Sequence, residues 1–201
     1  MMRSLQQLSK NMLSQAKKQP EPFFIHTLGG PCSGKSFLTK QLTSILVSHN
    51  PVYIGWDHLM EQLPEYQAID DKKAAFEAFE KPVLEKGYEL LGQLIDKQVN
   101  IIFEHSGARE DHLDILNRAK YTKGYRIIIV PLFHPIELAK KWVEERNQKG
   151  HRYTPLSYVE ERAKILEALE PRYQMIADHL IKKHEDNSMD DVVEQIAGVL
   201  R

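Results

Sequence analysis

Residues 29–36 of this chain read Gly-Gly-Pro-Cys-Ser-Gly-Lys-Ser, which is a complete match to the pattern G-x-x-x-x-G-K-[ST]. In this pattern, backbone N–H groups between the two glycines close around nucleotide phosphates. The lysine reaches the β- and γ-phosphates, and the final hydroxyl binds Mg²⁺. We therefore expect a phosphate-binding loop with Ser36 as a metal ligand. The residues expected to contact the nucleotide are Gly29, Gly30, Pro31, Cys32, Ser33, Gly34, Lys35 and Ser36.

The sequence on either side supplies the strand and the helix that such a loop requires. Residues 22–28 are apolar and β-prone, as a buried strand should be. After Lys35, apolar residues recur at helical spacing, so the loop opens a helix whose N-terminus favours an anion. An ordinary glycine-rich turn is the alternative, but it does not require this order of elements.

Composition and charge indicate a globular protein of ordinary type. Hydrophobic residues make up 42% and charged residues 27% of the chain, and the net charge of −1 gives no basic field that would attract nucleic acid or anionic membrane. The N-terminus does not resemble a signal peptide, and no apolar run reaches 18 residues. We therefore expect a cytoplasmic protein with neither nucleic acid nor membrane as a partner.

Histidine and cysteine usage points to no metal or disulfide framework. The nine histidines stand alone or beside unlike neighbours, without the Cys/His spacing of a zinc site. The single cysteine, Cys32, lies inside the phosphate loop and indicates a reducing compartment. Nothing in the sequence supports redox control through Cys32.

Strand and helix signals alternate along the chain, which predicts an α/β fold with a parallel five-stranded sheet flanked by helices. The expected strands are 22–28, 51–56, 99–104, 125–133 and 179–182. The expected helices are a leading one within 1–20, one after Lys35, and others at 70–98, 135–149, 155–169 and from 188 onward. We expect the 70–98 helix to break near Pro82, which lacks a backbone N–H. Residues 1–201 are interpreted as one domain, in which 135–170 form a lid and its flanking helices.

Two acidic residues follow expected strands, at the sheet edge where ligands of such folds bind. Asp57 follows the second strand and is positioned to accept a proton from a hydroxyl that attacks the γ-phosphate. Glu104 ends the apolar third strand like a Walker B acid, and is expected to hold Mg²⁺ through water or to bind substrate. Each could instead cap a helix or be a solvated loop acid.

Phosphoryl transfer also needs positive charge on the migrating group, and the segment 140–155 is densely basic. Its residues Arg146 and Arg152 flank Gly150, where a helix should stop and a mobile loop begin. Arg162 lies on the next helix. We predict that these three arginines are catalytic cations; the alternative is a solvated helix surface paired with nearby glutamates.

Together these residues resemble the zeta-toxin-like P-loop kinases, over about 23–171. Asp57 followed by Pro64 and Tyr66 is similar to the family stretch D-x-x-R-x-x-h-P-x-Y, and residues 100–104 resemble its I-I-x-E strand. The lid of short members, R…G-G-H…P…R, resembles Arg146, Gly150, His151, Pro155 and Arg162. The resemblance implies a three-layer P-loop NTPase fold with a helical lid, ATP and Mg²⁺ as cofactors, Asp57 as the base, and two lid arginines at the γ-phosphate.

The chain departs from this family pattern at positions that lie toward the phosphate acceptor. Met60 stands in place of an arginine, Gly55 in place of a frequent aspartate and His105 in place of a glycine, while Arg109 is one place beyond the usual arginine. The family's best-known acceptor, UDP-N-acetylglucosamine, is therefore not specified by these residues. An antitoxin partner is implied by the resemblance alone.

The sequence as a whole predicts an ATP-dependent kinase that transfers the γ-phosphate of Mg·ATP to a hydroxyl of a small molecule, with sugar nucleotides among the candidates. Another metabolite or nucleoside kinase, or an antibiotic phosphotransferase similar to the chloramphenicol enzymes, is the alternative. A nucleotide-dependent switch ATPase without an acceptor is an alternative of another class. An apolar pocket beside Asp57 would favour a kinase, and a flat exposed face there would favour a switch.

Overall fold

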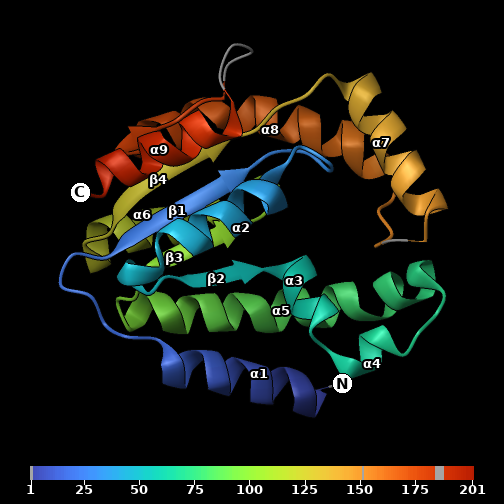
Figure 1. Cartoon of the computed structure of the whole chain (residues 1–201), viewed down its shortest axis with the longest axis horizontal. Coiled ribbons are helices and arrows are strands. Elements are labelled where there is room, and N and C mark those ends of the chain that lie inside the picture. The colour runs from blue at the N-terminus through green and yellow to red at the C-terminus, as the bar shows by residue number, and fades with distance from the viewer. Residues whose placement is uncertain (1, 151, 184–187) are drawn as a thin grey trace.

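A central sheet of five parallel strands, in the order β2-β3-β1-β4-β5, runs through the molecule with helices on both faces (Figure 1). The computed structural model describes residues 2–150, 152–183 and 188–201. The strands are β1 Phe23–Leu28, β2 Val52–Gly55, β3 Ile101–Glu104, β4 Arg126–Pro131 and β5 His179–Leu180. The predicted α/β fold with a parallel five-stranded sheet is confirmed.

The helices cover the sheet and connect its strands. They are α1 Met2–Gln15, α2 Lys35–Ile45, α3 Trp56–Glu61, α4 Pro64–Gln67, α5 Lys72–Asp96, α6 Asp111–Asn117, α7 Ile136–Gln148, α8 Ser157–Ile176 and α9 Met189–Val199. Three of these, α3, α4 and α6, were not predicted, because helices of 6, 4 and 7 residues are too short to show a clear apolar period. No helix in the described ranges is long and apolar enough to cross a bilayer.

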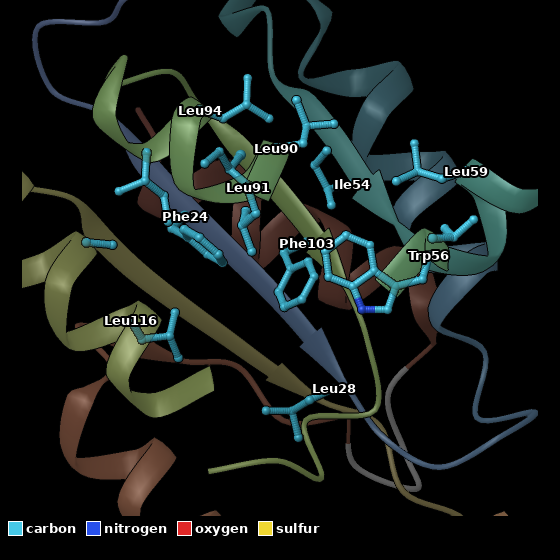
Figure 2. Close-up of a cluster of buried hydrophobic side chains, with 14 of the residues drawn as sticks. Phe24, Leu28, Ile54, Trp56, Leu59, Leu90, Leu91, Leu94, Phe103 and Leu116 are labelled. Carbon is cyan, nitrogen blue, oxygen red and sulfur yellow. The ribbon is translucent and has the colours of Figure 1, made fainter. Parts of the chain in front are cut away.

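Two apolar layers, one on each face of the sheet, hold the fold together. Alternate strand residues point to opposite faces, so Phe24 and Phe103 pack toward α1, α5, α6 and α8, while Ile25 and Ile102 pack toward α2 and α9. Figure 2 shows the first layer, where Leu91 of α5 lies near Phe24. Because both faces are covered, β1 and β3 are buried along their whole length and are mostly apolar rather than alternating.

The break expected near Pro82 does not occur. Helix α5 is 25 residues long in total and continues through Pro82. Phe76 and Phe79 are buried before the proline, and Leu90 and Leu91 are buried after it. Burying an aromatic or leucine side chain stabilises by about 1.5–3 kcal/mol. Several such contacts outweigh the roughly 3 kcal/mol that an interior proline costs. Helix α8 likewise continues to Ile176, beyond its expected end at 169, with Pro171 inside it.

Three histidines that are far apart in the sequence meet beneath the sheet edge. The ring of His112, on α6, lies 4.7 Å from that of His105 and 5.4 Å from that of His26, on β1. Burial lowers the pKa of all three imidazoles, that of His26 to about 4. The cluster is therefore neutral at physiological pH, and charging it costs folding free energy.

This cluster predicts that the protein loses stability as the pH falls below about 6.5. The unfolded histidines take up protons near pH 6.5, whereas the folded ones stay neutral, so the unfolded state binds more protons. Each such histidine lowers the free energy of unfolding by about 1.4 kcal/mol per pH unit. Urea unfolding between pH 7.5 and 5 should show this slope, reduced in His26→Leu and kept in the exposed control His134→Gln. A free energy of unfolding that is flat over this range would contradict the expectation.

Candidate active site

A cavity of about 1180 Å³ opens at the carboxyl ends of β1, β2 and β3. Every residue predicted to be catalytic lines it: Lys35, Asp57, Glu104, Arg146, Arg152 and Arg162. The 29–36 loop contributes all its residues except Gly30, which lines a smaller neighbouring pocket of about 260 Å³ together with Pro31 and Ser33. The fold thus brings the loop, both acids and the three arginines to one place.

The 29–36 loop connects β1 to α2 in a conformation that needs glycine at both of its ends. Gly29 has φ +150°, and a Cβ there would lie 2.1 Å from the carbonyl oxygen of Leu132. Gly34 has φ +89°, a region that other residues rarely adopt. Cys32 also has a positive φ, of 59°, although it is not a glycine. These backbone angles curl the chain around the Lys35 side chain.

Lys35 is the first residue of α2, and its ammonium group lies inside the curl of the loop. Nζ donates hydrogen bonds to the carbonyl oxygens of Gly29 at 2.9 Å and Gly30 at 2.7 Å, and to Ser33 Oγ at 3.2 Å. Burial lowers the pKa of Lys35 to about 8, an effect opposed by the charges of Glu104 and Asp57. The group is mostly protonated at neutral pH and is suited to bind phosphate oxygens.

Glu104 is buried at the end of β3, and hydroxyl groups engage both of its carboxylate oxygens. Oε1 accepts a hydrogen bond from Ser36 Oγ at 2.6 Å, and Oε2 accepts from Thr39 Oγ1 at 2.8 Å and from the Tyr53 hydroxyl. The Ser36 hydroxyl and the Glu104 carboxylate are hard oxygen donors, which suit Mg²⁺. Thr39 and Tyr53 were not predicted as site residues. The only signal for Thr39 was its place three residues after Ser36 on the same helix.

Asp57 follows the second strand, as expected, and lies near Arg152. It is the second residue of α3, because the helix begins at Trp56. Strand β3 lies between β2 and β1, so Asp57 follows the outermost strand on that side of the sheet. Asp57 Oδ2 is 3.2 Å from Arg152 Nη2, and Glu61 Oε1, one helical turn further on, is 3.5 Å from Arg152 Nη1.

The three predicted arginines have different surroundings. Burial alone would lower the pKa of Arg152, but the carboxylates of Asp57 and Glu61 outweigh it and raise that pKa. Arg146 donates to the hydroxyl of Thr154, and its buried Nε has no hydrogen-bond partner among the described residues. His151 of the expected lid pattern lies outside the described residues.

Arg162 is held beside the start of the 29–36 loop. Its Nη1 donates to Ser106 Oγ at 3.0 Å, and its guanidinium lies 4.3 Å from the centre of the Tyr158 ring. The backbone carbonyl of Ser106 in turn accepts from the N–H of Gly29 at 3.0 Å. Arg109 also lines the cavity, but Asp111 binds its guanidinium twice, at 2.6 and 3.0 Å.

On the α3 and α5 side the cavity has both apolar and charged walls, and the charged residues there are Asp57, Glu61, Glu80 and Lys81. Trp56, Phe76 and Leu84 line it there, with Tyr158 from α8. The Tyr158 hydroxyl donates to Glu80 at 3.1 Å, and burial raises the pKa of Glu80. A small organic molecule would find apolar walls here and a few polar groups to orient it.

Comparison with known proteins is consistent with this geometry. The family model described as "Zeta toxin" matches residues 8–190. No curated protein matches the sequence. A structure of the PezAT chromosomal toxin–antitoxin system of Streptococcus pneumoniae is 16% identical, with a TM-score of 0.67 over 93% of this chain and 78% of that one.

Two further solved structures have the same fold. Shikimate kinase from Acinetobacter baumannii in complex with shikimate is 17% identical, with a TM-score of 0.55 over 96% of both chains. The AvrRxo1-ORF1:-ORF2 complex with ATP is 14% identical, with a TM-score of 0.70 over 92% of this chain and 64% of that one. At such identities the likeness establishes the fold, which is that of P-loop kinases.

Proposed function

This chain belongs to the zeta toxin family, and on that premise we propose that it is an ATP-dependent kinase that phosphorylates a hydroxyl of a small molecule. The observation that carries the proposal is the shared cavity, in which Asp57 and Arg152 face the loop that holds Lys35 and Ser36. A base, a cation and a phosphate-binding loop are the parts that phosphoryl transfer requires.

Each residue has a separate role in the proposed transfer. Lys35 binds oxygens of the β- and γ-phosphates, and Ser36 and Glu104 hold Mg²⁺, which when bound neutralises phosphate charge. Asp57 takes the proton of the acceptor hydroxyl as its oxygen bonds to the γ-phosphorus. The bond from that phosphorus to the bridging oxygen breaks, and ADP leaves. Arg152 offsets the charge on the transferred group, with Arg146 and Arg162 as further cations.

The apolar walls beside Asp57 support an acceptor-using kinase over a switch ATPase. A switch needs no hollow next to its nucleotide, whereas there is one here, and Trp56, Phe76 and Leu84 are among the residues that line it. Two solved structures with a similar fold are a shikimate kinase and a gluconokinase, and their names fit small hydroxylated acceptors. Sugar nucleotides remain within the proposed class of acceptors. We also propose a cytoplasmic location. Because one structural neighbour is a toxin–antitoxin system, we propose an antitoxin as a protein partner.

Binding of Mg·ATP should stabilise the fold, because the nucleotide binds the folded loop and not the unfolded chain. At a hundredfold excess over its Kd it adds roughly 2.7 kcal/mol to the free energy of unfolding. Thermal unfolding in millimolar Mg·ATP measures this directly. Lys35→Ala should lose most of the protection, whereas the exposed control Lys18→Ala should keep it. Unchanged thermal stability of the wild type would refute nucleotide binding.

The acceptor itself is found by a screen with γ-labelled ATP. Purified protein is incubated with sugars, sugar nucleotides, hydroxylated acids and aminoalcohol antibiotics, and transfer of label is measured against Lys35→Ala. Label in one acceptor class identifies the substrate. Label released only as inorganic phosphate, with every acceptor class, would favour the switch ATPase.

A further inference from the structure

The hydroxyl of Tyr53 reaches across the edge of the sheet to the candidate metal-binding acid. Tyr53 lies on β2, the outermost strand on that side, and its hydroxyl donates to Oε2 of Glu104 on β3. Thr39 donates to the same oxygen at 2.8 Å. The other oxygen, Oε1, is therefore the one that faces Ser36 Oγ, at 2.6 Å.

Gly55 provides the space that this contact needs. Its φ of −149° and ψ of 130° are ordinary extended angles, which any residue adopts, so the backbone does not require glycine here. A Cβ at this position would lie 2.9 Å from the Tyr53 hydroxyl oxygen and 3.3 Å from its Cζ. The position of the Tyr53 hydroxyl therefore depends on Gly55, because the absence of a side chain at residue 55 leaves room for it.

We propose that Tyr53 is a positioning residue that, through the space left by Gly55, fixes the Glu104 carboxylate so that Oε1 and Ser36 Oγ hold Mg²⁺ together. This inference rests on the proposed kinase function.

Tyr53 is suited to this role because it stays a hydrogen-bond donor. A tyrosine hydroxyl ordinarily has a pKa of about 10, so its proton remains on the oxygen throughout the physiological range. The ring is also held in place, with its centre 4.8 Å from that of His58 on α3. Residues that orient a metal ligand in this way typically change metal affinity by about 10–100-fold when they are removed.

The test measures metal binding directly, with Mn²⁺ as the probe, because Mn²⁺ also prefers oxygen ligands and its free form is counted by electron paramagnetic resonance. We expect the Kd of Mn²⁺ for the protein–ADP complex to rise about 10-fold or more in Tyr53→Phe. Gly55→Ala should give a similar rise although its tyrosine is intact. The double variant should be no worse than Tyr53→Phe alone, because both changes remove one contact.

Tyr125→Phe is the matched control. It also loses a buried tyrosine hydroxyl, which donates to the carbonyl of Val99 at 2.8 Å far from the cavity, and it should leave Mn²⁺ affinity within twofold. Metal-free ADP binding, measured by calorimetry in EDTA, should be the same in all variants. A Mn²⁺ affinity of Tyr53→Phe within twofold of wild type, or an equal loss of metal-free ADP binding, would overturn the inference. If the wild type bound no ADP at all, the proposed function would fail instead.

Discussion

Asp57→Asn is expected to lower turnover by about 100-fold or more while ATP affinity stays the same or improves. A general base typically contributes about 10²–10⁴-fold, and an amide cannot take the proton of the acceptor hydroxyl. ATP affinity should not fall, because the substitution removes a negative charge near the phosphates and releases Arg152 from an ion pair at 3.2 Å. Steady-state kinetics with the identified acceptor gives the turnover, and calorimetry gives the ATP affinity.

Glu61→Gln is the matched control for this substitution. Glu61 is on the same helix, contacts the same arginine at 3.5 Å and loses the same charge. Since it is not the proposed base, its turnover should fall by less than about 10-fold, in keeping with a role limited to binding Arg152. If Asp57→Asn turned over its acceptor as fast as Glu61→Gln does, the base would be another residue.

Arg152→Ala should have the largest effect of the lid substitutions, a loss of about 10³-fold or more in single-turnover phosphoryl transfer. An arginine that meets the γ-phosphate mainly in the transition state affects kcat more than ATP affinity. Arg152→Lys should be nearly as harmful, because lysine keeps the charge but lacks the planar fork.

Arg146 provides the comparison within the same segment. Its guanidinium donates a hydrogen bond to the Thr154 hydroxyl. The side chain of Asn147 also forms two hydrogen bonds with the backbone of Thr154, at 2.8 and 3.0 Å. We therefore expect Arg146→Ala to act partly through the shape of the connection between α7 and α8, and to lower the rate less than Arg152→Ala does. Rates within twofold of wild type in Ala and Lys variants at both positions would show that neither arginine takes part in phosphoryl transfer. The catalytic cation would then have to be Arg162, since Asp111 already binds Arg109.

The parts of the site that depend on local order could be predicted from the sequence. A phosphate loop needs a strand before it and a helix after it, and acids that follow parallel strands must meet at one sheet edge, so Lys35, Ser36 and Glu104 were identifiable. The strand before Asp57 ends earlier than expected for a local reason, because Trp56, although apolar, already begins α3.

What could not be predicted depends on contacts between distant residues. Tyr53 and Glu104 are 51 positions apart, and the histidine cluster joins β1 to α6, so neither leaves a local pattern. The continuity of α5 through Pro82 is of the same kind. Local propensity favoured a break at Pro82. Packing of α5 on the sheet keeps the helix continuous, and this packing cannot be read from the local sequence.

The contact between α3 and Arg152 has a consequence for how such an enzyme would avoid hydrolysing ATP with water. Both terminal nitrogens of the arginine face carboxylates of α3, one at Asp57 and one at Glu61. While that contact lasts, the charges of the aspartate and the arginine are paired with each other. A γ-phosphate that draws the arginine away also frees the aspartate, so base and cation become available in a single event. The Arg152 guanidinium would thus keep Asp57 from activating water until a nucleotide is bound.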